Sequence, residues 1–155
     1  RYRGDEIAFA SFGDSAVSEG YVYEAISGAA REALPVIFVI QNNRYGISVP
    51  NTEQSANLNV AENFLGFKQV KIVNVDGTNV FDSWKGMQHA LDYVREKKGP
   101  AIVHADCVRM NSHSNSDKHE LYRTPEEIAE AALFLCRAES VTGTTVTVAG
   151  GGEVH

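Results

Sequence analysis

Residues that could bind a phosphorylated ligand and a metal ion gather in two short polar clusters, Gly13–Ser15 and Asn42–Tyr45. The first follows an apolar run, Ile7–Phe12, and the second closely follows another, Val36–Ile40. Such runs are typical of buried strands, and in an open parallel sheet ligands bind beyond the carboxyl ends of the strands. We therefore expect the two clusters to lie together at one edge of a sheet.

The side chains of these clusters suit a particular chemistry. Gly13 permits a tight turn, and the amides of Ser15 and Ala16 lie just before a predicted helix, a position that favours a phosphate or diphosphate. Asp14 provides a carboxylate and Asn43 an amide oxygen, and Mg²⁺ accepts such ligands alongside phosphate oxygens. The clusters therefore predict a magnesium–diphosphate site. The alternative, a turn without a ligand in which Asp14 only caps the helix, stays open at this point.

Secondary-structure signals predict the elements that would position these clusters. A helix over residues 18–33 is favoured by alanine and glutamate and is ended by Leu34–Pro35, so it connects the two apolar runs as a βαβ unit. The same alternation continues with strands at 70–75 and 101–105 and helices at 60–67 and 79–97. The predicted fold is α/β and doubly wound, with a mainly parallel sheet.

Periodicity also predicts which residues are buried. The first strand, residues 6–12, is expected to be covered on both faces. Residues expected on the buried faces of the helices are Ala25, Gly28 and Ala29 in the first, Ala61, Phe64 and Leu65 in the short one, and Val80, Trp84, Met87, Ala90, Leu91 and Val94 in the last. Asp76 lies at a strand end, where a catalytic role is one alternative, but it is interpreted as a structural turn residue, with Asn79 as a cap of the helix that follows.

Bulk properties exclude several classes of protein. A length of 155 residues, 43% hydrophobic and 22% charged, fits one soluble globular domain. The net charge of −6 argues against nucleic acid as a partner, and no 18-residue apolar run predicts a membrane span. Cys107 and Cys136 fit no metal-binding spacing and are expected to be free thiols. Because the chain starts without Met, it is interpreted as a fragment, in which the absence of a targeting segment proves nothing.

The combination of motifs resembles a known family. Gly13–Asp14 is followed by E-G-x-x-x-E-A at Glu19–Ala25, by Leu34–Pro35 with an apolar strand, and by N-N-x-Y-G-I-S at Asn42–Ser48. This order is similar to the thiamine diphosphate motif in the alpha subunit of 2-oxo acid dehydrogenases, the decarboxylating component of the pyruvate and branched-chain complexes. The resemblance extends from about residue 4 to residue 123. The family motif is usually G-D-G, whereas this chain has serine at position 15.

The resemblance implies a set of cofactor ligands. Asp14, the Asn43 side chain and the Tyr45 carbonyl would hold Mg²⁺, and the backbone of Gly13, Asp14, Ser15 and Ala16 would bind the diphosphate of thiamine diphosphate. Ile47 would lie beside the cofactor, although a role in packing the loop at 44–59 is equally compatible with its residue type.

A second polar stretch, residues 106–123, follows the last predicted strand. Its string S-H-S-x-S-D at 112–117, followed by Tyr-Arg, also resembles the family, although a lone histidine is more often structural. By this resemblance His113 would contact the diphosphate and assist acyl transfer to a lipoyl group. Ser114 matches a position phosphorylated in some relatives, while His119 matches nothing and is expected to be exposed. The residues implied in ordering this loop are Arg109, Asp117, Tyr122 and Arg123.

The implied function is thiamine diphosphate- and Mg²⁺-dependent oxidative decarboxylation of a 2-oxo acid, with acyl transfer to the lipoyl domain of an acyltransferase component. This chain would supply the diphosphate-binding half, and a beta subunit the other half, in the bacterial cytoplasm or the mitochondrial matrix. Alone, the fragment is expected to be inactive. The alternatives are a non-catalytic interaction module and half of a transketolase-like enzyme. The sequence does not identify which 2-oxo acid is used.

The end of the chain differs from the rest. Residues 124–128 are a good helix start, with Thr124 as N-cap, Pro125 at the first position and Glu127 completing a capping box. A helix to residue 138 and a strand at 141–148 are expected, and this stretch resembles the C-terminal end of a short-chain dehydrogenase. Two explanations remain open: the tail is native to this protein, or two sequences are joined artificially at the string T-P-E-E-I-A, residues 124–129. The predicted organisation is a partial thiamine diphosphate-binding domain at 1–123 and a tail at 124–155.

Overall fold

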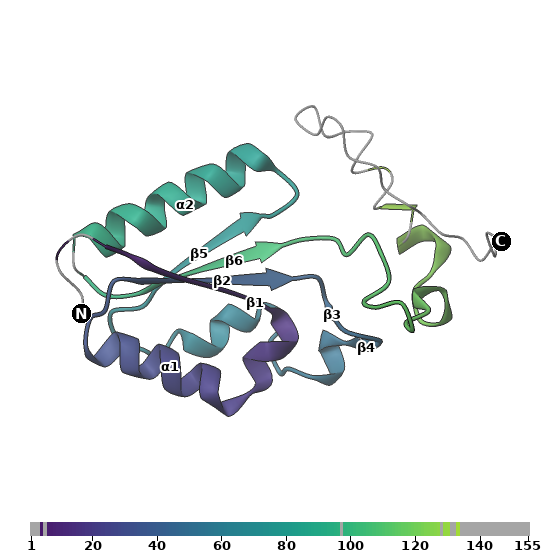
Figure 1. The fold of residues 1–155 in the computed structure, drawn as a ribbon, viewed down its shortest axis with the longest axis horizontal. Helices are drawn as coiled ribbons and strands as arrows, with labels where there is room; N and C mark the ends of the chain where they lie inside the picture. The colour runs from purple at the N-terminus through teal and green to yellow at the C-terminus, as the bar shows by residue number, and fades with distance from the viewer. Residues whose placement is uncertain (1–3, 5, 97, 128, 131–132, 134–155) are drawn as a thin grey trace. The chain divides into compact units, whose positions relative to one another are not determined.

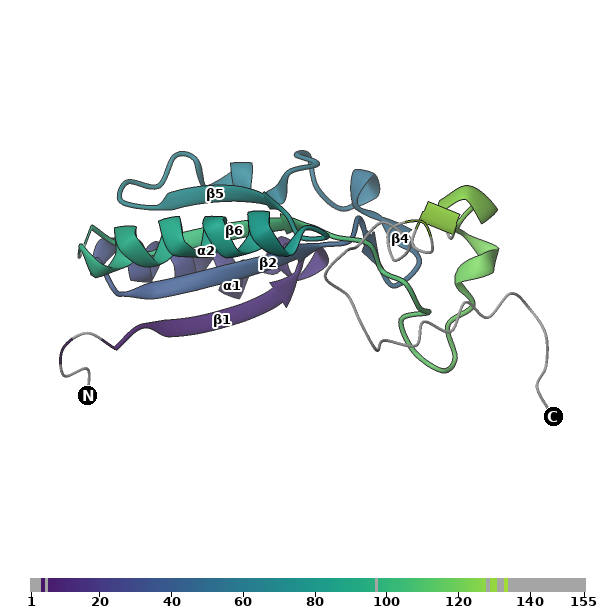
Figure 2. The same cartoon turned by 90° about the horizontal axis from the view of Figure 1, so that it is seen from above.

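The computed structural model describes residues 4, 6–96, 98–127, 129–130 and 133. The chain forms two compact units, Arg1–Cys107 and Val108–His155, which are described separately. The first unit is built on a parallel sheet of strand order β1-β2-β6-β5, whose strands lie side by side in Figure 2. The strand bounds are Ala8–Gly13 for β1, Val36–Asn42 for β2, Lys71–Asp76 for β5 and Ala101–Asp106 for β6.

The register of the sheet brings the strand ends to one edge. Gly13 pairs with Gln41 across β1 and β2, and Asn42 pairs with Asp106 across β2 and β6. Asp76 at the end of β5 also pairs with Asp106. The strands of this sheet run parallel, so the polar residues that follow them share the carboxyl edge, as the sequence predicted.

Helices cover both faces of the sheet, which confirms the doubly wound α/β fold. Helix α1, Gly20–Arg31, lies against one face, and helix α2, Val80–Arg95, lies against the other (Figure 1). On the α1 side, 3₁₀ helices η1, Asp14–Ser18, and η3, Val60–Phe64, complete the layer. This arrangement is the one expected when right-handed crossovers connect parallel strands.

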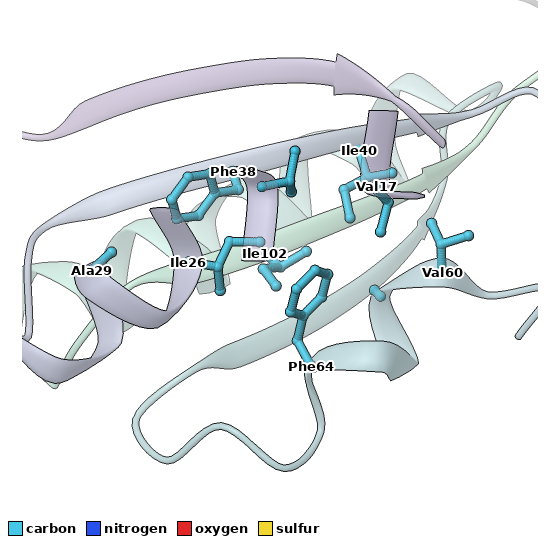
Figure 3. Close-up of a cluster of buried hydrophobic side chains, with 10 residues drawn as sticks. Val17, Ile26, Ala29, Phe38, Ile40, Val60, Phe64 and Ile102 are labelled. Atoms are coloured by element: carbon cyan, nitrogen blue, oxygen red, sulfur yellow. The ribbon is translucent and has the colours of Figure 1, made fainter. Parts of the chain in front are cut away.

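The larger core lies between the sheet and the α1 layer. Phe38 and Ile40 of β2 and Ile102 of β6 face Ile26 of α1 and Phe64 of η3 (Figure 3). Ile26, Ile40, Ile102 and Phe64 are completely buried. Because neighbouring residues of a strand point to opposite faces, β2 contributes Phe38 and Ile40 to this core and Ile37 to the core on the α2 side.

Helix α2 approaches the sheet closely at Gly86. A Cβ atom placed on Gly86 would lie 2.1 Å from Cγ1 of Val75 in β5. Ala90 and Val94, one and two turns further on, are buried in the same core. The helix begins as predicted, since the Asn79 side chain accepts hydrogen bonds from the N–H groups of Phe81 and Asp82 at 3.0 and 3.2 Å.

Asp76 is a turn residue, as interpreted from the sequence. Its Oδ1 accepts from the N–H and the hydroxyl of Thr78 at 2.9 and 2.5 Å. The carboxylate is therefore engaged in holding the connection between β5 and α2.

Several burial predictions are wrong. Strand β1 is at the edge of the described sheet and has no buried residue: Ala10, Phe12 and Gly13 are half-buried, and the others are exposed, with Phe9 61% exposed. Val80 and Trp84 of α2 and Leu65 after η3 are also exposed, at 52%, 64% and 71%. The exposed residues are apolar, like the buried ones, but they lie on the outer face of their strand or helix. Residue type alone therefore does not reveal which apolar residues are buried.

The first predicted helix is shorter than expected. Residues 14–18 form a 3₁₀ helix, and the α-helix ends at Arg31, before Pro35. Ala33 adopts a φ of 47°, and the Leu34 N–H donates to the Ala29 carbonyl at 2.9 Å, so a left-handed residue rather than the proline ends the helix. Ala25 is exposed rather than buried, while Ala29 is buried as predicted.

The segment predicted as a loop at 44–59 contains short elements. Strands β3, Tyr45–Gly46, and β4, Val49–Pro50, pair antiparallel, and 3₁₀ helix η2, Asn51–Glu53, follows. In the second unit, η4 spans His119–Leu121. The predicted strand at 141–148 and Cys136 lie outside the described residues. Within the described part of the chain, no helix is long and apolar enough to cross a membrane.

The capping box at the start of the last predicted helix is confirmed. The Thr124 N–H donates to Oε2 of Glu127 at 2.7 Å, and the Glu127 N–H donates to Oγ1 of Thr124 at 3.2 Å. The two side chains therefore satisfy two backbone donors reciprocally, as this motif requires.

The close contact at Gly86 predicts the effect of adding one methyl group. Gly86→Ala should lower the free energy of unfolding by about 1–3 kcal/mol, because its Cβ would overlap Val75. Gly28→Ala in α1 is the matched control, since nothing lies within 4 Å of the added Cβ, and it should raise stability by about 0.5–1 kcal/mol. Urea denaturation measures both. Equal effects of the two substitutions would contradict the packing described for α2.

Candidate functional site

The predicted anion-binding turn is a short 3₁₀ helix. Gly13 ends β1 in an extended conformation, with φ −81° and ψ 166°, so this position does not use the conformational freedom of glycine. Asp14 begins η1 and is only 2% exposed. The amides of Ser15 and Ala16 belong to the first turn of this helix, where N–H groups have no partner within the helix. The turn therefore presents a buried carboxylate next to backbone donors.

The second cluster forms a tight turn after β2. The Asn43 Oδ1 accepts from the Tyr45 N–H at 3.0 Å, and Arg44 adopts a φ of 67°. Ile47 has a φ of 58° and is 53% exposed. A β-branched residue in the left-handed region is strained, and such strain is typical of functional sites. Because the amide oxygen of Asn43 accepts the hydrogen bond from Tyr45 with one lone pair, it has a second lone pair for a ligand.

The structure brings the two clusters together. A Cβ atom added to Gly46 in β3 would lie 2.2 Å from Oγ of Ser15 in η1. The Ser18 hydroxyl donates to the Gln54 carbonyl at 3.3 Å, so the loop is tied to the same 3₁₀ helix. The predicted ligand residues at 14 and 45 therefore belong to segments in direct contact.

A buried network of polar side chains connects the segments at the carboxyl edge of the sheet. Asn42, the last residue of β2, is 3% exposed, and its Oδ1 accepts from the Arg44 N–H at 3.1 Å and from Nδ2 of Asn51 at 3.4 Å. Its Nδ2 lies 3.3 Å from the Leu58 carbonyl oxygen and 3.2 Å from Nε2 of His104. One side chain therefore connects β2, β6 and the intervening loop.

The hydrogen bonds of Asn42 bear on the protonation of His104. Nδ2 of Asn42 lies within hydrogen-bond distance of three groups, Nε2 of His104 at 3.2 Å and the Leu58 carbonyl and Oδ1 of Asp106 at 3.3 Å each. A neutral imidazole with its proton on Nδ1 can accept from this amide at Nε2. His104 is 4% exposed, and burial lowers its pKa, while the carboxylates of Asp106 and Glu62 act in the opposite direction. Folding therefore favours the neutral form of His104.

Negative charge dominates the electrostatics of the edge. Burial raises the pKa of the Cys107 thiol to about 11, and the charges of Asp14 and Asp106 raise it further in the same direction. Cys107 is a free thiol, as predicted, and its raised pKa excludes it as an activated nucleophile. The exposed Arg44–Asp106 pair, 3.7 Å apart, adds little to stability.

The predicted metal ligands are oxygen donors, the type that a hard cation prefers. Among the described residues, no group of three His, Cys, Asp or Glu side chains gathers as a metal-binding cluster. The predicted set is different, because it combines one carboxylate with an amide oxygen and a carbonyl oxygen. Such oxygen donors, few in number, suit Mg²⁺ when phosphate and water complete the octahedron.

In the second unit, the residues predicted to order the loop do come together. The Tyr122 hydroxyl accepts from Nη2 of Arg109 at 2.5 Å and donates to Oδ2 of Asp117 at 2.7 Å. The His113 N–H donates to the same carboxylate oxygen at 2.6 Å. Hydrogen bonds from Tyr122 and His113 lower the pKa of Asp117. Burial, and to a lesser degree the hydrogen bond to Asp117, raises the pKa of Tyr122 to about 12. The His113 side chain is exposed.

The expectation that His119 is exposed is wrong. It is 3% exposed, and its Nδ1 lies 3.4 Å from Nη1 of Arg123, which also donates to the Arg109 carbonyl at 2.6 Å. Arg123 is itself buried, at 7% exposed, and folds the segment back on itself. A histidine that matches no motif can thus be a packing residue.

Comparison with known proteins identifies the family. Residues 1–133 match the family model described as Dehydrogenase E1 component. The chain belongs to this family. The resemblance to alpha subunits of 2-oxo acid dehydrogenases is thereby confirmed.

Curated relatives of this family member are alpha subunits. The 2-oxoisovalerate dehydrogenase subunit alpha of Bacillus subtilis (strain 168) is 33% identical over 127 residues, which cover 82% of this chain and 38% of the relative. The 3-methyl-2-oxobutanoate dehydrogenase subunit alpha of Mycobacterium tuberculosis (strain ATCC 25618 / H37Rv) is 35% identical over 124 residues, covering 80% and 34%. The pyruvate dehydrogenase E1 component subunit alpha of Zymomonas mobilis is 38% identical over 129 residues, covering 83% and 36%. The chain therefore spans less than two fifths of their length.

Sequence reasoning missed the buried polar residues of this E1 family member. The sequence indicates Asn42 only as part of the cluster that contains Asn43, and no motif singles out His104 or Asn51. A histidine inside an apolar strand, as in Ile102–Ala105, is the signal that could have indicated a buried hydrogen-bond partner. The partner itself is 62 positions away, and spacing along the chain does not reveal it.

The state of His104 predicts a pH dependence of stability. The unfolded chain takes up a proton near the ordinary pKa of 6.5, whereas folding holds the pKa of His104 lower. As pH falls below 6.5, the unfolded state binds more protons, so the free energy of unfolding should decrease until the lowered pKa is reached. Urea denaturation between pH 8 and pH 5 measures this. His104→Gln keeps an acceptor but cannot titrate, and an unchanged pH slope in this variant would contradict the assignment.

The network around Tyr122 predicts how loop order depends on one hydroxyl. Tyr122→Phe removes the link between Arg109 and Asp117 and should speed hydrogen exchange at the His113 amide roughly fivefold, the equivalent of one ordinary hydrogen bond. Exchange followed by NMR gives the readout. Ser116→Ala, which removes an exposed hydroxyl in the same loop, should leave the rate unchanged. Equal rates in all three proteins would mean that the hydroxyl does not order the loop.

Proposed function

We propose that this chain forms the diphosphate-binding half of a thiamine diphosphate- and Mg²⁺-dependent enzyme that oxidatively decarboxylates a 2-oxo acid. The observation that carries the proposal is the buried Asp14 carboxylate at the end of β1, in a turn that contacts β3. Membership of the dehydrogenase E1 component family supports it. The bound cofactor would supply a thiazolium carbon acid and an electron sink, while the protein binds and orients it.

The proposed roles of the residues follow from their donors. Asp14, the Asn43 amide oxygen and the Tyr45 carbonyl oxygen would bind Mg²⁺, which offsets the negative charge of the diphosphate at this acidic edge. The amides at 15 and 16 would bind phosphate oxygens. Ile47, exposed and strained, would support the cofactor. Its strain is consistent with a surface that a ligand covers.

The second unit would take part in the later half of the reaction. We propose that His113 contacts the diphosphate and assists acyl transfer to a lipoyl group, and that the Arg109–Asp117–Tyr122 network orders its loop. The hydrogen bond from the His113 N–H to Asp117 supports the ordering role, because it links that network to the backbone of His113. A beta subunit would complete the site, and the lipoyl domain of an acyltransferase component would receive the acyl group.

The names of the relatives state two substrates. Two names state the same compound, called 2-oxoisovalerate in one and 3-methyl-2-oxobutanoate in the other, and a third name states pyruvate. The shared chemical class is a short 2-oxo acid. The site residues described here concern the cofactor and its metal. We therefore propose the reaction class and leave the choice among 2-oxo acids to assays with a beta subunit present.

Removing the metal ligands tests the proposal. Mg²⁺ with thiamine diphosphate should raise the melting temperature of the wild-type chain, because a ligand that binds only the folded state stabilises it. Asp14→Asn removes the charged ligand and should weaken affinity by more than the roughly 10- to 100-fold that loss of an outer-sphere partner costs. Asn43→Ala should act in the same direction. Calorimetric titration measures the affinities.

Asp76→Asn is the matched control for this test. Asp76 is a carboxylate at the same edge of the sheet, but it holds the turn before α2. Its amide variant should bind the cofactor with wild-type affinity. If Asp14→Asn and Asp76→Asn bind equally well, or if the wild-type chain is not stabilised at all, the cofactor assignment is wrong.

A further inference from the structure

The side chain of Ser15 occupies a position between the two segments of the proposed site. It lies in η1, next to Asp14, and its Oγ faces the backbone of Gly46 in β3. A Cβ atom on Gly46 would be 2.2 Å from this oxygen and 2.7 Å from the amide atoms of Gln54. Position 46 therefore has room only for glycine while Ser15 and Gln54 hold these positions.

The Ser15 hydroxyl is buried without a hydrogen bond. Among the described residues, its Oγ has no partner, although it is inaccessible to solvent. Two nearby polar groups are already engaged, because Nε2 of Gln54 donates to the Val49 carbonyl at 2.6 Å and the Gln54 carbonyl accepts from the Ser18 hydroxyl. A buried polar group without a partner costs about 1–3 kcal/mol, and such an exception in a folded protein indicates a missing ligand, ion or water.

The location of the hydroxyl indicates what its partner is. Ser15 follows the buried Asp14 and precedes Ala16, so it lies within the turn whose amides would bind phosphate. Rotation about χ1 moves a serine hydroxyl between three staggered positions without any change of the backbone. A hydroxyl bonds strongly to an anionic oxygen, because charge-assisted hydrogen bonds are about twice as strong as neutral ones.

We infer that the Ser15 hydroxyl donates a hydrogen bond to a phosphate oxygen of the diphosphate bound at this turn. The inference rests on the proposed function and adds a side-chain contact to it. A G-D-G sequence would provide only backbone donors at this position. With serine, the chain gains one further donor to the anion, and the hydroxyl acquires a partner only when the ligand is present.

This assignment has a thermodynamic signature that a structural role would not produce. Ser15→Ala removes a buried donor that has no partner in the ligand-free protein, so the melting temperature without ligand should stay the same or rise. The same substitution should weaken ligand affinity about tenfold or more, the range for a hydrogen bond to a charged group. A hydroxyl that served only to stabilise the fold would show the opposite pattern.

The experiment compares the full chain and two variants by calorimetric titration and thermal unfolding. The probes are Mg²⁺–thiamine diphosphate and Mg²⁺–pyrophosphate, which share the diphosphate and differ in the thiamine part. Ser15→Ala should lose affinity for both probes by the same factor. Ser27→Ala is the control, because it removes an exposed hydroxyl of α1 outside both clusters, and its affinities should match the wild type.

The outcomes separate the inference from the proposed function. Wild-type binding together with unchanged affinity in Ser15→Ala overturns the inference alone. So does a lowered melting temperature of ligand-free Ser15→Ala, a loss confined to the thiamine compound, or an equal loss in Ser27→Ala. If the wild-type chain binds neither probe, the proposed function fails and the inference fails with it.

Discussion

The carboxyl edge of the sheet depends on the buried amide of Asn42. Its oxygen holds the Arg44 N–H and therefore the turn that carries Asn43, and its nitrogen faces acceptors on β6 and on the loop. An amide enclosed in this way is stable only while each of its groups has a partner, since an unsatisfied one costs about 1–3 kcal/mol. The position of Asn43 is thus set by the interior of the protein, although the turn itself reaches the surface.

The charges at this edge are consistent with a ligand that brings a cation. Asp14 and Asp106 both act on the Cys107 thiol and raise its pKa, so their negative potential extends across the ends of neighbouring strands. A diphosphate approaching such an edge alone would be repelled, whereas a metal–diphosphate complex would not. The buried position of Asp14 strengthens its attraction to a cation, because screening by solvent is weak there.

The two lateral edges of the sheet differ in character. Strand β5 exposes Lys71, Asn74 and Asp76, and polar residues of this kind protect an edge from pairing with other chains. Strand β1 exposes apolar residues, including Phe9, and helix α2 exposes Phe81 and Trp84. Large exposed apolar side chains of this kind are found at interfaces between proteins or domains. The first unit therefore has a polar edge at β5 and exposed apolar side chains on β1 and α2.

The sequence alone determined the class of fold, the order of the elements and the residues of the two clusters. These features depend on local signals: apolar runs, turn residues and caps act over a few positions, as Asn79 and the Thr124–Glu127 capping box show. The family resemblance added the roles assigned to Asp14 and Asn43. Length and spacing were enough to place both clusters at the carboxyl edge, because parallel strands end on the same side.

Only the tertiary structure decided which apolar residues are buried and which polar residues meet. The exposure of Phe9 and Trp84 depends on the position of β1 in the sheet and on the face that α2 presents, neither of which is encoded in residue type. The contact of Asn42 with His104 requires β2 and β6 to be neighbours in space, although η3, β5 and α2 separate them in the chain. The burial of the Ser15 hydroxyl against Gly46 depends likewise on the loop folding back onto η1, because long-range packing, and not local preference, determines these contacts.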